Sequence, residues 1–496
     1  MSCRRDNITG EERAQIALQC LASQGRRDGK RQELAAKYSL SRQSIHRMER
    51  QARAALAEIL KPKAHGPVAK VREVMVTPEH VQRSVLVLAG SAVSERGIQA
   101  CLEQILGCKP SLGSINATLR RLGQRAAEVN ASWQPAINEG LAADEIYCQG
   151  VPNLLVVGSE SLYIYALTKQ DMRDGETWAC VLWDTPTTGQ LARDGGTGLR
   201  AGASLTGRPE QLDWWHVLRD VWRIDASLER RAYGFLHELF ARETSFDEAH
   251  TTKRLTQHLM GWEKLSQQAN EAMQDHDRYH TLARTVDDLF GMIDLATGAL
   301  LDGPTVLERM KVLGKQIHDL EGRACSTLGT TLEAQAPYLF AYLPRLRSAL
   351  APIQAHWGQE AVAGLCRIWQ VEEQCRRRQL CSADRQQLNA IWQTAFEATA
   401  RLLGDDLFEA WEDVQALLGL NWRGSNAAEC VNSLLRPHFN AQRSTSQNAL
   451  DLRRFLHNTR TFARGKRAGH SPAQLVGIEL PSDPLTLLGL PQCRLT

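Results

Sequence analysis

The chain has 496 residues, of which 43% are hydrophobic and 23% charged, and its formal net charge is only +3. A single hydrophobic core rarely grows to this size, so about three domains are expected. No apolar run reaches the ~18 residues that a membrane helix needs, and the N-terminus has no signal-peptide core. The 12 Cys form no Cys-x-x-Cys pair, which favours reduced thiols. We therefore expect a soluble cytoplasmic protein.

The basic residues are unevenly distributed. Residues 1–73 contain 16 Lys/Arg and 8 Asp/Glu, a local charge of 16 − 8 = +8. A second basic run extends from Arg453 to Arg467. Local basic patches, rather than global charge, are the footprint of phosphate binding, so both segments are candidates for contact with nucleic acid.

Residues 1–60 have the pattern of a helix-turn-helix domain. Thr9 and Glu12 form a capping-box pattern that opens a first helix. A short helix from Arg31, a tight turn at 39–41 and a helix from Arg42 onward follow. Such a fold places the first turn of its last helix in the major groove of DNA. The candidate DNA contacts are Arg42, Gln43, Ser44, His46 and Arg47. Short look-alikes of this pattern are common in other helical proteins.

A linker over residues 60–67 precedes a second helical domain, which we assign to residues 61–132. Its predicted helices cover residues 78–89 and 94–106 and a stretch through Leu122. The polar face of the last helix carries Arg120 and Arg121. The domain is either a second helix-turn-helix, with these two arginines as DNA contacts, or a three-helix spacer.

From residue 133 the pattern changes to short apolar strands, and we assign 133–219 to a further domain. Strands are expected over residues 141–147, 152–157, 162–167, 189–194 and 211–216. Helices are expected after Asp174 and after Gly196. Asp144 lies in the first strand, and Asp194 ends the fourth. Three antiparallel strands, a helix, a strand ending on an acid, a helix and a strand form the order of an RNase H-like core.

The rest of the chain is predicted to be mainly helical. It divides into an all-α insertion over 220–417, the last part of the core over 418–480 and a tail over 481–496. No catalytic grouping stands out in the insertion. Its helical histidines show no metal-ligand pattern and are expected to be structural or solvated: His250, His258, His276 and His280.

One late helix carries a single acid among small residues. Glu429, Asn432 and Arg436 are spaced to share one helical face. The opposite face carries Val431, Leu434 and Leu435, which are expected to pack into a core. Taken alone, Glu429 is better explained as a solvated residue of an amphipathic helix.

Taken together, these stretches resemble bacterial insertion-sequence transposases of the Asp/Asp/Glu class, which have an RNase H-like core. The resemblance covers most of residues 134–216 and 418–477. It rests on Ala143-Asp-Glu-Ile-Tyr147, Gly175-Glu-Thr-Trp178, Arg193-Asp-Gly-Gly-Thr-Gly198, Ser425-Asn-Ala-Ala-Glu-Cys-Val-Asn-Ser-Leu-Leu-Arg436 and a tail over 452–475. Asp213-Trp-Trp-His216 is similar to a motif of transposases that carry an all-α insertion, such as the hAT and Mutator types. The resemblance implies a multidomain α+β protein: tandem helix-turn-helix modules followed by an RNase H-like core with a large helical insertion.

The resemblance also implies a metal site. Two Mg²⁺ or Mn²⁺ ions would be held by Asp144, Asp194 and Glu429, because hard oxygen ligands suit phosphoryl transfer with two metals. Glu145 is a weaker candidate, since it points to the other side of its strand. Asp213 and His216 would position these ligands or the DNA end. Asn432 and Arg436 would orient Glu429 or contact phosphate.

The resulting expectation is a transposase that cleaves DNA and transfers strands. Its partners would be double-stranded DNA, as transposon ends with terminal inverted repeats and as target. It would act as a homodimer or higher oligomer, associated with a bacterial nucleoid. Two alternatives stay open: a sequence-specific DNA-binding regulator with an inactive core, and a structure-selective nuclease.

Overall fold

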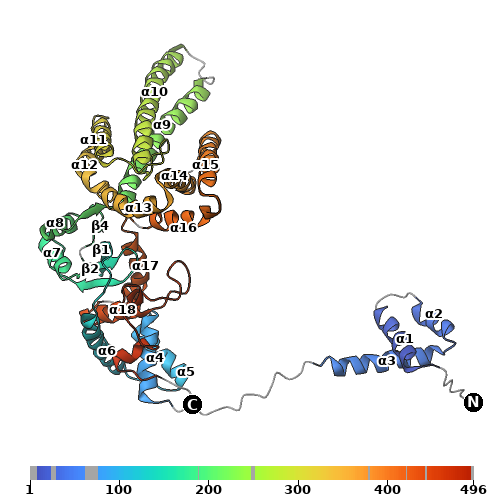
Figure 1. Cartoon of the computed structure of the whole chain (residues 1–496). Helices are drawn as coiled ribbons and strands as arrows, with labels where there is room; N and C mark the ends of the chain where they lie inside the picture. The colour runs from blue at the N-terminus through green and yellow to red at the C-terminus, as the bar shows by residue number, and fades with distance from the viewer. Residues whose placement is uncertain are drawn as a thin grey trace, which may run out of the picture. The chain divides into compact units, whose positions relative to one another are not determined.

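The computed structural model describes residues 8–23, 29–61, 76–187, 189–246, 252–377, 380–420, 422–441 and 444–492. The chain divides into two compact units, Met1–Met75 and Val76–Thr496 (Figure 1). Most of the predicted linker and His250 lie outside the described residues. Across the described ranges, none of the helices is both long enough and apolar enough to span a bilayer. The finer domain boundaries within the second unit stay predictions.

Three helices form the first unit: α1 (Gly10–Ala22), α2 (Lys30–Lys37) and α3 (Arg42–Ile59). The predicted capping box is present, because Thr9 and Glu12 each accept the backbone N–H of the other. The helices share a small core of Ile16, Cys20, Leu34, Ala35 and Ile45. Buried Glu49 of α3 accepts hydrogen bonds from Arg31 and Arg53. These bonds lower the pKa of the Glu49 carboxyl, and the bond from Arg31 makes the largest contribution. These bonds tie α2 to α3.

The second unit begins with three helices as predicted: α4 (Pro78–Gly90), α5 (Glu95–Leu106) and α6 (Leu112–Ser132). Each helix is capped by a hydroxyl side chain that accepts a backbone N–H: Thr77, Ser94 and Ser111. The apolar face of α6 packs on α18 (Gln447–Thr459). Asn130 of α6 also donates to the carbonyl of Asp451, 321 residues later. This helical bundle is therefore joined to the end of the chain.

Five strands form one mixed sheet in the order β3-β2-β1-β4-β5. They are β1 (Leu141–Cys148), β2 (Val151–Gly158), β3 (Ile164–Lys169), β4 (Leu191–Arg193) and β5 (Glu210–Leu212). The first three strands pair antiparallel, whereas β1–β4 and β4–β5 pair parallel. The fold class is therefore α+β, and the sequence order of strands and helices is as predicted.

The predicted end of the last strand is wrong. The strand was expected to reach His216, but β5 ends at Leu212 and α9 begins at Trp214. Asp213 lies between them, and its carboxylate accepts the N–H of Trp215 at 2.8 Å. This capping contact starts a helix where the apolar run alone suggests a continuing strand.

The two faces of β1 meet different helices, because successive side chains point to opposite sides. On one face Leu141 and Ala143 pack with residues of α7 (Gly175–Trp183) and α8 (Thr197–Thr206). On the other face Ala142 and Ile146 pack with α17 (Asn426–Asn440). Figure 1 shows the sheet between these two helical layers. A helix from the last quarter of the chain thus covers the first strand.

Between β5 and α17 the described chain is almost wholly helical, as predicted. The helices are α9 (Trp214–Phe246), α10 (Thr252–Leu289), α11 (Gly303–His318), α12 (Arg323–Leu339), α13 (Leu343–Trp357), α14 (Gln359–Arg377), α15 (Ser382–Leu403), the short η1 (Gly404–Asp406) and α16 (Leu407–Leu418). They enclose their own apolar core. α9 and α10 lie side by side as a long hairpin (Figure 1).

After α17 the chain continues through α18, α19 (Pro472–Leu475) and η2 (Pro484–Leu488). α18 covers the outer strand β3, where Asn458 bonds both the N–H and the carbonyl of Ile164. Arg454 donates to the same carbonyl, and buried Arg453 donates to the carbonyl of Ala89. Arg453 and Arg454 therefore each donate to an internal carbonyl, and phosphate binding by the 453–467 run stays a prediction.

Candidate active site

Asp144 and Asp194 occupy matching positions on neighbouring strands. In the parallel pairing of β1 with β4, Ala142 lies opposite Ala192. Two residues further along each strand lie Asp144 and Asp194, the latter directly after the end of β4. Adjacent strands are about 4.8 Å apart. The sheet therefore brings the two carboxylates together at one edge, as the strand order predicts.

The two faces of β1 separate Asp144 from its neighbour Glu145. Asp144 is on the α17 face, with Ala142 and Ile146. Glu145 is on the α7 face, where it pairs with Arg173 at 2.8 Å and accepts a hydrogen bond from the Trp178 indole at 3.3 Å. Glu145 therefore anchors α7 and the loop before it to the sheet.

Asn432 of α17 holds Asp144. Its side-chain nitrogen donates to Asp144 Oδ2 at 2.6 Å, while the backbone N–H of Glu145 donates to Oδ1 at 2.7 Å. We expected Asn432 to act on Glu429 or on phosphate. That expectation is wrong, because Asn432 is only 1% exposed and faces the sheet. The inward stripe of α17 is also rotated from the expected one: Val431 and Leu435 are buried as predicted, but Leu434 is exposed.

Glu429 lies in the first turn of α17, and its side chain is 47% exposed. Its Oε1 is 3.5 Å from Nε2 of His216, in the first turn of α9. Nδ1 of His216 is buried and has no hydrogen-bond partner among the described residues. The structure thus pairs His216 with the acid that it was predicted to position. Arg436 is exposed on α17.

Asp213 acts on the backbone that carries Glu429. It is fully buried and accepts hydrogen bonds from the backbone N–H of Ser425, at 2.8 Å, and from the Ser425 hydroxyl, at 2.5 Å. The N–H of Trp214 donates to the carbonyl of Arg423 beside it. Burial excludes direct contact of Asp213 with DNA. Its carboxylate instead joins the start of α9 to the start of α17.

Burial and neighbouring negative charges act on the Asp144 carboxyl. Burial, and then the charges of Asp194, Glu145 and Glu429, raise the pKa of Asp144 to about 6, against the opposing hydrogen bond from the N–H of Glu145. Within the described ranges, the only trio of potential ligands with atoms all within 4.8 Å lies elsewhere. The ligand atoms of Asp144, Asp194 and Glu429 are therefore not all within 4.8 Å of one another.

This donor set fits hard divalent cations. Three carboxylates of like charge lie around one edge of a sheet, and the amide of Asn432 and the backbone N–H of Glu145 donate to Asp144. Oxygen ligands of this kind suit Mg²⁺ and Mn²⁺, and a cation would offset the repulsion that raises the pKa of Asp144. Asp144, Asp194 and Glu429 are the residues that could hold such ions.

The loop after Asp194 shapes this edge. Asp194 Oδ1 accepts the N–H of Gly196 at 2.9 Å, just before α8 begins at Thr197. Gly198 leaves no room for a side chain, because a Cβ there would lie 1.9 Å from the carbonyl oxygen of Arg173. Glycine is therefore required where α8 passes the loop before α7.

The candidate DNA contacts are accessible within their own units. Arg42, Gln43, His46 and Arg47 are exposed at the start of α3, and Ser44 is half-buried. The Ser41 hydroxyl caps this helix by accepting the N–H of Ser44. In the second unit Arg120 and Arg121 are exposed on α6, and Arg121 donates to the side chain of Gln82. Their predicted contact with DNA stays a prediction.

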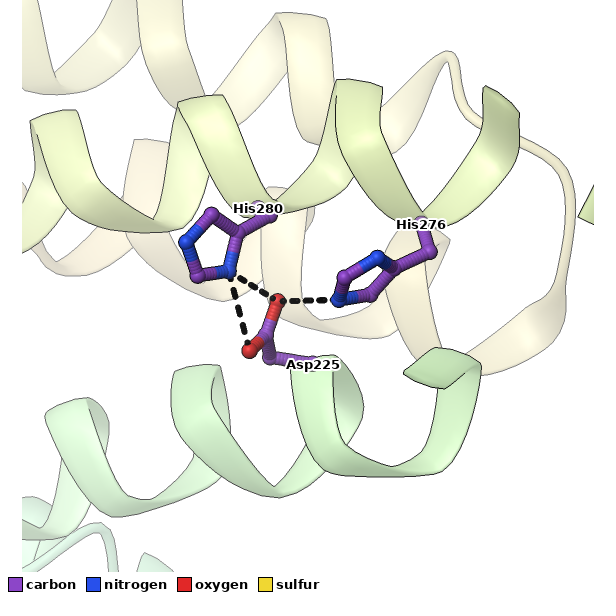
Figure 2. Close-up of side chains that lie close together, drawn as sticks. All are labelled: Asp225, His276 and His280. Carbon is purple, nitrogen blue, oxygen red and sulfur yellow. Dashed lines mark hydrogen bonds and ion pairs between the residues drawn. The ribbon is translucent and has the colours of Figure 1, made fainter. Parts of the chain in front are cut away.

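A second ligand group lies in the helical hairpin, where none was expected. Asp225 of α9 meets His276 and His280 of α10, with one ligand atom of each within 4.8 Å of the others (Figure 2). The two histidines are four residues apart, a spacing that places them on one helical face and that was visible in the sequence. Their carboxylate partner is distant in sequence, so the pattern alone was incomplete. For this pair the structure shows a possible ligand arrangement that the sequence pattern did not indicate.

Comparison with protein-family models gives no match, and comparison with curated proteins gives no significant match.

Proposed function

We propose that this protein is a DNA transposase of the Asp/Asp/Glu class, with an RNase H-like core and a helical insertion between β5 and α17. The observation that carries the proposal is the convergence of three acids, distant in sequence, around the α17 face of β1. Asp144 and Asp194 each lie two residues beyond the paired Ala142 and Ala192, and the charge of Glu429 contributes to the raised pKa of Asp144. The joining of all five strands in one sheet, in the order β3-β2-β1-β4-β5, supports the choice of this core.

Each residue of the candidate site has a role in this reaction. Asp144, oriented by Asn432 and the N–H of Glu145, would hold divalent ions together with Asp194 and Glu429. Mg²⁺ or Mn²⁺ bound there would stabilise the incoming and departing oxygens of in-line phosphoryl transfer. His216 restrains the exposed Glu429 carboxylate. The nucleophile is water or a DNA 3′-OH, so the chain forms no covalent intermediate.

DNA recognition belongs to the helices before the sheet. In the first unit, exposed Arg42, Gln43 and Arg47 lie at the start of a capped helix, and arginine and glutamine can each form two hydrogen bonds with a base edge. Exposed Arg120 and Arg121 offer a second basic surface on α6. Two helix-turn-helix readers would suit a long terminal repeat, and assembly of two or more chains would pair two ends.

The test uses the full chain and DNA containing its own gene with both flanks, assayed with Mg²⁺ for new 3′-OH ends and for joined products. Asp194→Asn and Glu429→Gln should each reduce cleavage more than about 100-fold, since metal-bound oxygens contribute several kcal/mol to transition-state stabilisation. Binding of the flanks should be unchanged. Glu409→Gln is the matched control, because Glu409 is also an exposed acid in the first turn of a helix.

The outcomes separate the alternatives. Wild-type levels of cutting in either acid variant would show that the assignment of the acids is wrong. A wild-type chain that binds the flanks but does not cut would favour a DNA-binding regulator. Cutting that depends on branched DNA rather than on the flanks would favour a structure-selective nuclease.

A further inference from the structure

Three potential metal ligands meet between α9 and α10, in the part of the hairpin away from its tip. His280 Nδ1 is 3.1 and 3.2 Å from the two carboxylate oxygens of Asp225. His276 Nε2 is 3.7 Å from Asp225 Oδ1. Figure 2 shows the two imidazole rings on one face of α10, both directed at the carboxylate on α9.

These separations suit a tetrahedral metal ion. Zn²⁺ binds nitrogen and carboxylate oxygen at about 2.0–2.1 Å, so two ligand atoms of a tetrahedral site are about 3.3 Å apart. The distances from Asp225 to the two histidines, 3.1 and 3.7 Å, are on either side of this value. An ion could therefore enter with small side-chain movements.

The backbone around the trio is fixed by other contacts. Tyr279, between the two histidines in sequence, is fully buried, and its hydroxyl donates to the carbonyl of Val221 at 2.9 Å. The rings of Trp222 and His280 are in edge contact at 5.9 Å. Because these contacts hold α9 and α10 together beside the trio, the three ligand side chains are positioned before any ion binds.

The trio is also accessible. The side chain of Asp225 is 12% exposed and that of His276 19%, whereas His280 is 39% exposed. Solvent therefore reaches the His280 side, which gives an ion a path of entry and leaves room for water as a fourth ligand. Nδ1 of His276 is 3.4 Å from the exposed carboxylate of Asp277, which can fix the ring with Nε2 toward the site.

We propose that Asp225, His276 and His280 bind one divalent transition-metal ion of the zinc class, which fastens α9 to α10. Two imidazoles and one carboxylate favour such ions over Mg²⁺, which prefers oxygen ligands alone. The site is therefore distinct in chemistry from the three acids at the sheet. The inference does not depend on the proposed transposase activity.

The alternative is a hydrogen-bonded cluster with no affinity for metal. Zinc chloride is the probe, titrated by calorimetry into full-length protein previously treated with EDTA and dialysed, with Mg²⁺ in excess to occupy the acids at the sheet. His276→Gln, His280→Gln and Asp225→Asn remove one ligand each. Asp225→Asn keeps an oxygen that can accept a hydrogen bond from His280. His237→Gln is the matched control, because His237 is an exposed histidine of α9 outside the trio.

Wild type and His237→Gln should bind one more zinc ion per chain than the trio variants. Replacing partners of metal ligands already costs 10–100-fold in affinity, so loss of a ligand should cost about 100-fold or more. Zinc should also raise the melting temperature of wild type and His237→Gln but not that of the trio variants. This difference controls for zinc bound by cysteines elsewhere. Equal zinc binding in wild type and in a folded Asp225→Asn variant would overturn the proposal, as would the absence of zinc binding to wild type.

Discussion

Replacing Asp144 with Asn should stabilise the metal-free protein while abolishing its proposed activity. The Asp144 carboxylate is ionised at neutral pH in a site where burial and neighbouring negative charges oppose ionisation. Its pKa rises from 3.8 to about 6, a difference of about 2. At about 1.36 kcal/mol for each pKa unit, this amounts to about 3 kcal/mol at pH 8, which is an upper value because the side chain is partly solvated.

The hydrogen bonds of Asp144 need not be lost in this variant. The N–H of Glu145 can still donate to the remaining oxygen of an amide at position 144. The buried Oδ1 of Asn432 has no partner among the described residues, so a turned Asn432 amide can accept a bond from the new NH₂ group. The gain from removing the charge should therefore exceed the cost of rearrangement.

The expected change in melting temperature follows from the size of the second unit. At about 2.1 cal/mol/K per residue, its 496 − 75 = 421 residues give an unfolding entropy of about 0.9 kcal/mol/K. A gain of 1–3 kcal/mol thus corresponds to about 1–3 °C. Differential scanning calorimetry in EDTA at pH 8 would measure this increase for Asp144→Asn relative to wild type.

The pH dependence identifies the cause. Because the folded pKa of Asp144 is raised, the folded state binds more protons than the unfolded state between pH 3.8 and about 6. The contribution of the Asp144 carboxyl to wild-type stability is therefore fully present below pH 3.8 and is lost as the pH rises to about 6. The gain in stability of Asp144→Asn over wild type should be small near pH 4 and should reach its full size above pH 6–7. Mg²⁺ should then raise the melting temperature of wild type alone.

Two results would refute this reasoning. A lower melting temperature for Asp144→Asn at pH 8 in EDTA would mean that the buried charge carries no penalty. An advantage of equal size at pH 4 and pH 8 would mean that the effect does not come from ionisation of this carboxyl.

Three further predictions concern other parts of the proposed machinery. His216→Gln should reduce Mg²⁺-dependent cleavage about 10–100-fold with unchanged DNA binding, because partners of metal ligands contribute that much; a rate equal to wild type would contradict the role of His216 beside Glu429. Asp213→Ala should lower the stability of the second unit by about 3 kcal/mol or more, since it leaves buried donors of Ser425 without an acceptor. Calorimetry should show a fall in melting temperature of about 3 °C or more, and an unchanged melting temperature would be inconsistent with a stabilising contact between Asp213 and Ser425. Arg47→Ala should weaken DNA binding and, for a phosphate contact, reduce the slope of log affinity against log salt concentration by about 0.9. An unchanged slope would show that Arg47 does not contact phosphate.

The sequence predicts the sheet edge well because the signals there are local. An apolar run that ends on an acid, followed by two glycines, indicates a strand and a turn, and it places Asp194 correctly. The alternation of a strand likewise separates Asp144 from Glu145. These features depend on neighbouring residues, so no tertiary information is needed.

Prediction fails where a tertiary contact decides the outcome. A helical pattern places Asn432 beside Glu429 but does not say which stripe faces the sheet, and the rotation of α17 directs Asn432 to Asp144 instead. The run of tryptophans after Leu212 suggests a longer strand, because the capping role of Asp213 is not visible in an apolar pattern. Arg453 looks like a surface charge until its carbonyl partner, 364 residues away, is known.

The helical region between β5 and α17 is connected to the candidate site through its two ends. Its first and last segments meet where Asp213 accepts both donors of Ser425, across a separation of 212 residues. His216 follows Asp213 by three residues and Glu429 follows Ser425 by four. The contact between Asp213 and Ser425 therefore sets the distance between the His216 imidazole and the Glu429 carboxylate. A long excursion of chain costs little extra closure entropy once its ends are fixed. The region can therefore be large without disturbing the sheet, and any movement that changes the contact between Asp213 and Ser425 would alter the position of Glu429.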